Sequence, residues 1–134
     1  MQYPYGTTIA VADGETLRIL RNAGDEAHLR LEELAEPHLH GHNKGSGLRH
    51  HSSTTNHDAS RLREDSFASA AADWLNERTI SGEIERLFIV ATPKTLGELR
   101  RHYHKTLEAR LLGELIGEHT GDSLAHLHEV LVAP

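Results

Sequence analysis

The chain has 134 residues, a formal net charge of −6 and no cysteine. Its length fits one domain, and the lack of thiols excludes disulfides, thiolate zinc sites and cysteine nucleophiles. The N-terminal residues 1–15 lack a basic stretch followed by a long apolar run, and no segment approaches the ~18 apolar residues of a membrane span. We therefore expect a cytoplasmic protein that forms a single domain over residues 1–134 and does not insert into a membrane.

The first part of the chain predicts three strands joined by short turns. Residues 7–12 form a largely apolar run, and the Asp13-Gly14 dipeptide that follows is typical of hairpin turns. Residues 16–21 predict a second strand. In residues 28–34, leucines alternate with polar or charged side chains, which indicates a strand with one face in water. Short connections make consecutive strands antiparallel neighbours.

The remainder of the chain alternates helices with strands. A His-rich segment at 36–59 shows no hydrophobic period, which predicts a long loop. The continuous apolar run 86–91 predicts a central strand that is covered on both faces. Hydrophobic spacing, turn residues and capping residues give the other elements. These are a helix over about 60–79, a helix over 95–107, a strand over 110–116, and a last helix capped by Thr120 or Asp122 with Leu124, Leu127 and Leu131 facing inward.

These elements predict a three-layer α/β fold around a five-stranded mixed sheet. The two most apolar strands, 7–12 and 86–91, belong side by side in the centre, and strand 28–34 belongs at an edge. Strands connected through helices run parallel to their neighbours, so the predicted order is 3-2-1-4-5 with strand 2 antiparallel. This is the arrangement of the ribonuclease H-like fold. Right-handed crossovers place the first two helices on one face and leave the other face to the last helix.

The topology also predicts where a ligand would bind. Strands 1, 3, 4 and 5 end at one edge of the sheet, and open α/β sheets usually bind ligands at that edge. Asp13, the 36–59 loop, Thr92, Lys94 and residues 118–120 follow these strands, so we expect them to meet there. The helix after Thr92 directs free N–H groups at the same edge, which favours an anion. Turn formation by Asp13, helix capping by Thr92 and a solvated Lys94 are the simpler alternatives.

Two basic regions on an otherwise acidic chain predict an anionic partner, for which RNA or a ribosome is one candidate and a protein another. Residues 38–57 contain lysine and arginine but no acid, and residues 94–110 contain five basic residues against two glutamates. Six of the twelve histidines also lie in 38–57 and add positive charge as the pH falls. The residues predicted to contact this partner are Asp13, Lys44, Arg49, Thr92, Lys94, Arg100, Arg101 and Lys105.

His38, His40 and His42 have the His-x-His spacing of metal ligands. A specific site also needs a rigid frame, whereas glycines intersperse this stretch and no acid accompanies it. We therefore expect adventitious binding of a divalent metal such as nickel or zinc, with no resident cofactor. A metal-dependent hydrolase or nuclease that uses Asp13, a weak catalytic candidate, with the loop histidines is the enzymatic alternative.

Three segments resemble the bacterial host-attachment family, whose members are described as required for attachment to host cells. The segments are TTIAVADGETLRIL, RLFIVATPKTLGELRRHY and ELIGEHTGDSL, and LGELR at Leu96–Arg100 is the most specific match. The acid-x-Thr spacing of a further family element matches Glu118 and Thr120. This family is similar to the middle domain of archaeo-eukaryotic peptide-chain release factors, so the resemblance implies a ribonuclease H-like sheet and a role linked to translation or RNA.

Release factors carry a Gly-Gly-Gln loop before the long helix of this domain. The corresponding stretch here contains Gly45-Ser46-Gly47, and no glutamine follows. The resemblance therefore favours binding of RNA or a ribosomal partner without catalysis. A protein–protein adaptor that supports attachment to host cells is the second hypothesis, and the metal-dependent enzyme is the third. The sequence predicts no particular oligomeric state.

Overall fold

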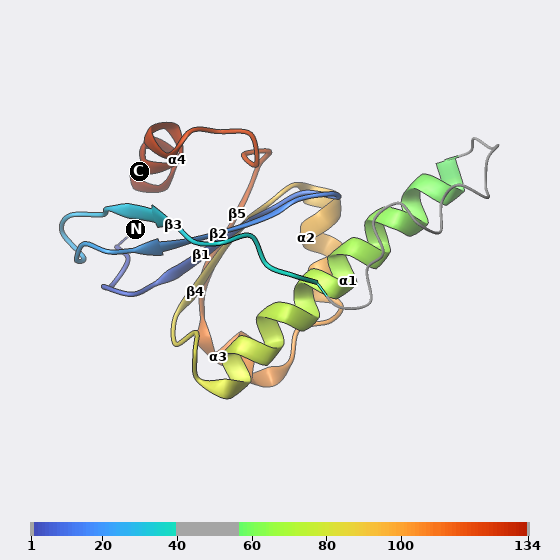
Figure 1. Ribbon diagram of the computed structural model, residues 1–134, viewed down its shortest axis with the longest axis horizontal. Coiled ribbons are helices and arrows are strands. Elements are labelled where there is room, and N and C mark those ends of the chain that lie inside the picture. Colours follow the sequence, from blue (N-terminus) through green and yellow to red (C-terminus); the bar gives the residue numbers. More distant parts are fainter. Residues whose placement is uncertain (1, 40–56, 134) are drawn as a thin grey trace.

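The computed structural model describes residues 2–39 and 57–133, with only the backbone of residues 57–61 included. Within these residues the chain forms a twisted sheet with helices on both faces (Figure 1). The elements are β1 (Thr8–Ala12), β2 (Leu17–Asn22), β3 (Leu31–Glu33), α1 (His57–Ser81), β4 (Leu87–Ala91), α2 (Pro93–Arg100), α3 (Lys105–Arg110), β5 (Leu111–Ile116) and α4 (Leu124–Val132).

The described strands are ordered β3-β2-β1-β4-β5, which confirms the predicted order. β2 is antiparallel to β1 and β3, whereas β1 pairs with β4, and β4 with β5, in parallel. Every residue of β1 and β4 is buried, as expected for central strands covered on both sides. The fold is therefore the predicted mixed α/β arrangement.

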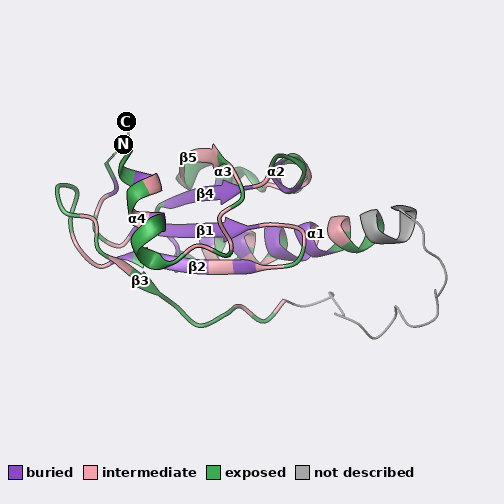
Figure 2. Cartoon of the chain, turned by 90° about the horizontal axis from the view of Figure 1, so that it is seen from above, coloured by how far each residue is buried: buried purple, intermediate pink, exposed green. Residues whose placement is uncertain are grey.

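Two apolar layers hold the helices against the sheet. On one face, Ala10 and Ile89 belong to a buried cluster with residues of α1, α2 and α3. On the other face, Ile9 and Val90 belong to a cluster that includes Leu127 and Leu131 of α4. Alternate residues of a strand point to opposite faces, so one apolar run supplies both layers. Figure 2 shows this burial concentrated in β1 and β4, with the outer side of α4 exposed.

Three boundaries differ from the sequence prediction. The loop predicted at 36–59 ends earlier, because α1 already begins at His57. The strand predicted at 28–34 contracts to Leu31–Glu33, because the Asp25 carboxylate accepts from the N–H of His28 and holds that residue in a turn. The last helix begins at Leu124 with Ser123 as its cap, so capping by Thr120 or Asp122 was wrong. Leu124, predicted to face inward, is exposed.

The helix predicted over 95–107 is in fact two helices. α2 ends at Arg100, and His104 takes an extended conformation in which its ring nitrogen accepts a hydrogen bond from the Thr106 N–H. The Asn76 side chain of α1 donates to the carbonyl of His102 and accepts from the N–H of His104, at 2.8 and 2.9 Å. Asn76 thus satisfies backbone groups that a continuous helix would have paired internally.

None of the helices in the part of the chain that the structure describes combines the length and the apolar character needed to cross a membrane.

Candidate functional site

The carboxyl ends of the central strands border a cavity of about 330 Å³. The hairpin after β1, the start of α2 after β4 and the segment after β5 all reach it, so the structure brings together the elements that the topology predicted to meet. Its lining residues are Asp13, Gly14, Glu15, Glu64, Thr92, Lys94, Thr95 and Glu118. Glu64 comes from α1 and was not among the residues predicted from the sequence.

Asp13 uses both carboxylate oxygens within the protein. Oδ1 accepts from the N–H groups of Glu15 and Thr16 at 2.8 and 2.7 Å, which closes the hairpin turn. Oδ2 accepts from the Thr120 hydroxyl at 2.6 Å and so links the hairpin to the segment after β5. Asp13 therefore serves as the turn former that its Asp-Gly sequence indicates, and it also joins two connections at this edge.

The cavity carries mostly negative charge. Lys94 forms an ion pair with Glu64, with 2.8 Å between Nζ and Oε1. Thr92 occupies the N-cap position of α2 but its side chain forms no capping hydrogen bond. Four carboxylates and one ammonium group line the cavity, which gives a net charge of −3. This charge opposes the attraction of the α2 N-terminus for an anion and favours a cation or a basic partner.

Arg18 holds the segment after β5 against the sheet. Its guanidinium donates to the carbonyl oxygens of Thr120 and Asp122 at 3.0 and 2.7 Å. The same group forms two hydrogen bonds of 2.8 Å to the carboxylate of Glu33 in β3. These bonds lower the pKa of Glu33 and raise that of Arg18. One side chain therefore fixes the edge strand and the segment after β5 together.

Replacing Glu33 with glutamine is expected to remove a stabilisation that depends on pH. The Arg18 hydrogen bond lowers the folded-state pKa of Glu33 below its ordinary value of 4.5. The ion pair therefore stabilises the fold above that value, and the benefit is lost as the pH falls through the folded-state pKa. Glu33 is partly exposed, so we expect an effect below ~1 kcal/mol at neutral pH. Urea unfolding across pH would show the difference between the two proteins shrinking on acidification, whereas a constant difference would contradict this explanation.

The predicted basic residues at the end of α2 differ in availability. Arg100 is paired with Glu114, which also accepts a hydrogen bond of 2.8 Å from the Tyr103 hydroxyl. Burial, reinforced by this bond, raises the pKa of Tyr103 well above its ordinary range.

The other two predicted basic residues are less occupied. Arg101 lies 3.6 Å from Glu98 and its side chain is exposed, and Lys105 forms no ion pair with any described residue. The charge that remains available therefore lies near the start of α3.

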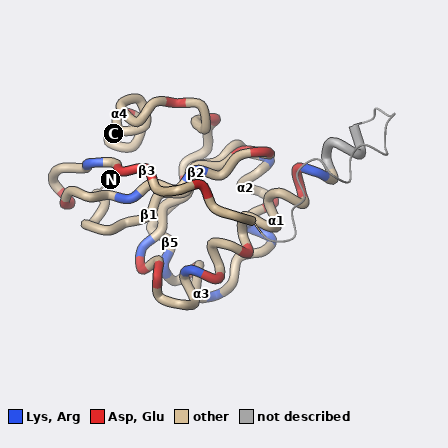
Figure 3. Tube along the Cα trace, viewed as in Figure 1, with Lys and Arg blue, Asp and Glu red and all other residues tan. Residues whose placement is uncertain are grey.

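Two further cations lie beside α3: Arg110, which belongs to the predicted basic region 94–110 but was not named as a contact residue, and Arg86, which the sequence analysis missed. Arg86 precedes β4, Arg110 ends α3, and both line a shallow cavity of about 410 Å³ with Glu85, Ala109 and Leu112. Neither arginine forms an ion pair within the described residues, and both are exposed. The sequence could have indicated that they lie close together, because each immediately precedes one of two strands, β4 and β5, that pair in parallel. Figure 3 shows basic and acidic segments interleaved around α3.

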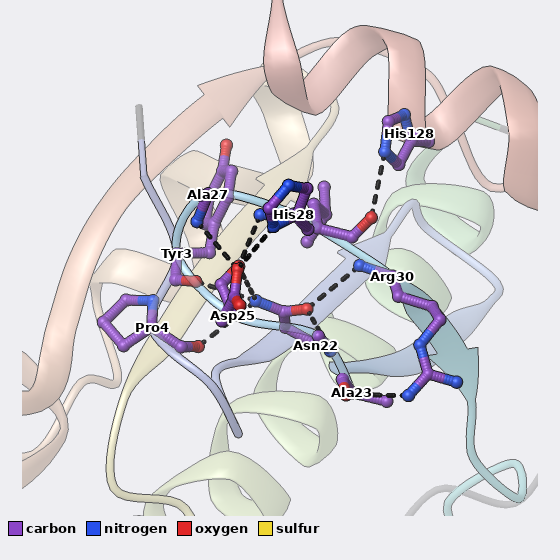
Figure 4. Close-up of polar contacts among 11 residues, drawn as sticks. Tyr3, Pro4, Asn22, Ala23, Asp25, Ala27, His28, Arg30 and His128 are labelled. Carbon is purple, nitrogen blue, oxygen red and sulfur yellow. Dashed lines mark hydrogen bonds and ion pairs between the residues drawn. The ribbon is translucent and has the colours of Figure 1, made fainter.

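A polar network at the opposite end of β2 supports the fold. The buried Asn22 side chain accepts from the N–H groups of Gly24 and Arg30 and donates to the carbonyl of Tyr3 (Figure 4). His128 of α4 donates to the carbonyl of Leu29 in the same connection, at 3.0 Å. These contacts fix the β2–β3 connection and α4 without forming a pocket, so we assign them a structural role.

Four of the residues predicted to bind a metal or RNA, His40, His42, Lys44 and Arg49, lie outside the described residues. His38 is described and exposed, and the neighbouring Leu39 packs against the core layer that contains α1. The proposed roles of these residues in RNA or metal binding therefore stay predictions.

The chain matches one family model over residues 6–131, from the start of the sheet to the last turn of α4. The model is described as bacterial archaeo-eukaryotic release factor family 12. No curated protein matches the chain.

Proposed function

We propose a function from one finding, which is that the chain belongs to bacterial archaeo-eukaryotic release factor family 12. The proposed function is that of a translation-related domain that binds RNA or a ribosomal surface and does not catalyse a reaction. The observation that carries the proposal is the family match over residues 6–131. The sheet order β3-β2-β1-β4-β5, in which only β2 runs against the others, agrees with the ribonuclease H-like sheet that the resemblance to release-factor middle domains implies.

Charge favours α3 over the Asp13 cavity as the contact surface. Phosphate groups would meet a net charge of −3 at the cavity, where the one lysine is already paired. Arg86, Lys105 and Arg110 are exposed and form no ion pair with other described residues. We call these three residues the α3 cations and propose that they contact phosphates, with Lys44 and Arg49 of the His-rich stretch adding to the same interaction.

Binding to purified ribosomal subunits should depend steeply on salt. Each phosphate that the protein neutralises contributes roughly −0.7 to −0.9 to the slope of log affinity against log salt. With three contacts, affinity should fall by about 10- to 50-fold between ~50 and ~200 mM salt. Sedimentation with ribosomal subunits at several salt concentrations measures this slope. Absent binding, or binding that salt does not weaken, would argue against the proposed function.

A protein adaptor in attachment to host cells is the second candidate. The resemblance to the host-attachment family suggests it, and exposed apolar side chains such as Tyr5, Ile80 and Ile116 give such a partner contact points. A metal-dependent hydrolase centred on Asp13 is less consistent with the geometry, because both carboxylate oxygens already accept hydrogen bonds. Recovery of envelope proteins without ribosomal components would favour the adaptor.

A further inference from the structure

Three metal-binding side chains gather where the segment after β5 enters α4. His119 and Asp122 belong to that segment, and His126 lies in the first turns of α4. One ligand atom from each of the three lies within 4.8 Å of the others. The rings of His119 and His126 are 6.3 Å apart between centroids. No contact of this trio contributes to the binding function proposed above.

We propose that His119, Asp122 and His126 form a site for a divalent transition metal ion of the Zn²⁺ type. Bonds of about 2.0–2.2 Å from zinc to nitrogen and oxygen place tetrahedral ligand atoms about 3.4 Å apart. Nε2 of His126 is already 3.5 Å from Oδ2 of Asp122. Nδ1 of His119 is 2.6 Å from the same oxygen, so this hydrogen bond would lengthen by about 1 Å when a metal replaces the shared proton.

The segment that carries the ligands is held on several sides, as a specific metal site requires. Arg18 donates to the carbonyl oxygens of Thr120 and Asp122, and Thr120 donates to Asp13. The Ser123 hydroxyl accepts from the N–H of His126 and so fixes the start of α4 that presents its ring.

The surroundings of the two rings also suit metal binding. Nδ1 of His126 lies 3.8 Å from a carboxylate oxygen of Glu129, which is longer than a hydrogen bond, so Glu129 adds a nearby negative charge that favours a bound cation. Nε2 of His119 lies so close to Gly117 that a Cβ at position 117 would approach it to 2.7 Å. Glycine at 117 therefore leaves room for the ring orientation that directs Nδ1 toward Asp122. With three protein ligands, the fourth tetrahedral position stays open to water or a partner group.

The test must separate this site from the histidines of the 38–57 stretch. We would replace His38, His40, His42, His50, His51 and His57 with glutamine in the full chain and titrate this background variant with Zn²⁺ against a chelating dye. Tight binding of one equivalent is expected, and Co²⁺ should give the visible absorption of a tetrahedral site. Adding His126→Ala should weaken binding more than ~10-fold, because one of three ligands is removed. His28→Gln, at an exposed histidine of the β2–β3 connection, is the control and should leave affinity unchanged.

The His126 side chain is 56% exposed, so its replacement should not disturb the core, and circular dichroism without metal verifies this. Asp122→Asn provides a second variant and should weaken binding in the same way. Either of two results would overturn the proposal. The first is a background variant that binds no stoichiometric metal. The second is unchanged affinity in both the His126→Ala and Asp122→Asn variants.

Discussion

Replacing Asn22 with alanine is expected to lower the free energy of unfolding by about 2–4 kcal/mol, because this buried side chain bonds three backbone groups at once. Its carbonyl accepts from Gly24 and Arg30 at 2.8 and 3.0 Å, and its amide donates to Tyr3 at 2.7 Å. The residue itself is fully buried. The buried Tyr3 carbonyl would lose its partner inside the protein, at a cost of roughly 1–3 kcal/mol, whereas the part-buried N–H groups of Gly24 and Arg30 would each cost less. Urea unfolding followed by circular dichroism measures the loss.

Arg30→Ala is the matched control for this substitution. It preserves the backbone N–H of Arg30, which donates to the Asn22 side chain. It removes only the exposed hydrogen bond from the Arg30 guanidinium to the Ala23 carbonyl. We expect a loss below ~1 kcal/mol, as for surface substitutions in general. If the two variants proved equally stable, the network drawn in Figure 4 would not have the structural importance that we assign to it.

Reversing the charge of two α3 cations, in the double variant Lys105→Glu and Arg110→Glu, is expected to weaken binding to ribosomal subunits by 10- to 100-fold. This order-of-magnitude value applies at ~50 mM salt. Each lost phosphate contact should also reduce the slope of log affinity against log salt concentration by about one. Both side chains are exposed and form no described ion pair, so the fold should tolerate the change. Sedimentation at graded salt measures both quantities.

Lys94→Ala tests the alternative location at the Asp13 cavity. Because Lys94 is paired with Glu64 among several other carboxylates, its removal should alter affinity for ribosomal subunits by less than ~3-fold. A larger effect of Lys94→Ala than of the α3 double variant would place the contact at the carboxyl ends of the strands, where the sequence alone had predicted it.

The sheet could be predicted because its signals are local. The apolar runs that became β1 and β4 required burial on both faces, and the short connection at Asp13-Gly14 required an antiparallel neighbour. The break between α2 and α3 could not be predicted in the same way. It depends on Asn76, which lies 26 residues before His102 in the sequence and contacts it only after α1 packs beside α2.

The candidate site, like the fold, could be predicted only where neighbouring residues determine it, and not where it depends on residues distant in the sequence. The topology predicted that Asp13, Lys94 and Glu118 lie near one another, and they line one cavity, but it did not predict Glu64, which α1 brings from a distant part of the sequence. Glu64 pairs with Lys94 and leaves the charges of Asp13, Glu15 and Glu118 uncompensated, so the predicted anion site is an acidic cavity. Likewise, His119 and His126 look unrelated in sequence until Ser123 begins α4 and turns His126 back toward Asp122.

The most direct measurement of the proposed function is isolation of the full chain from cells at low salt, followed by sequencing of bound RNA and identification of bound proteins. The affinity tag should not be oligohistidine, since the chain itself contains twelve histidines. The proposed function predicts enrichment of ribosomal RNA and ribosomal proteins, and this enrichment should be reduced by the α3 double variant and by high salt. Recovery of envelope proteins alone, or ribosomal enrichment that neither change reduces, would contradict it.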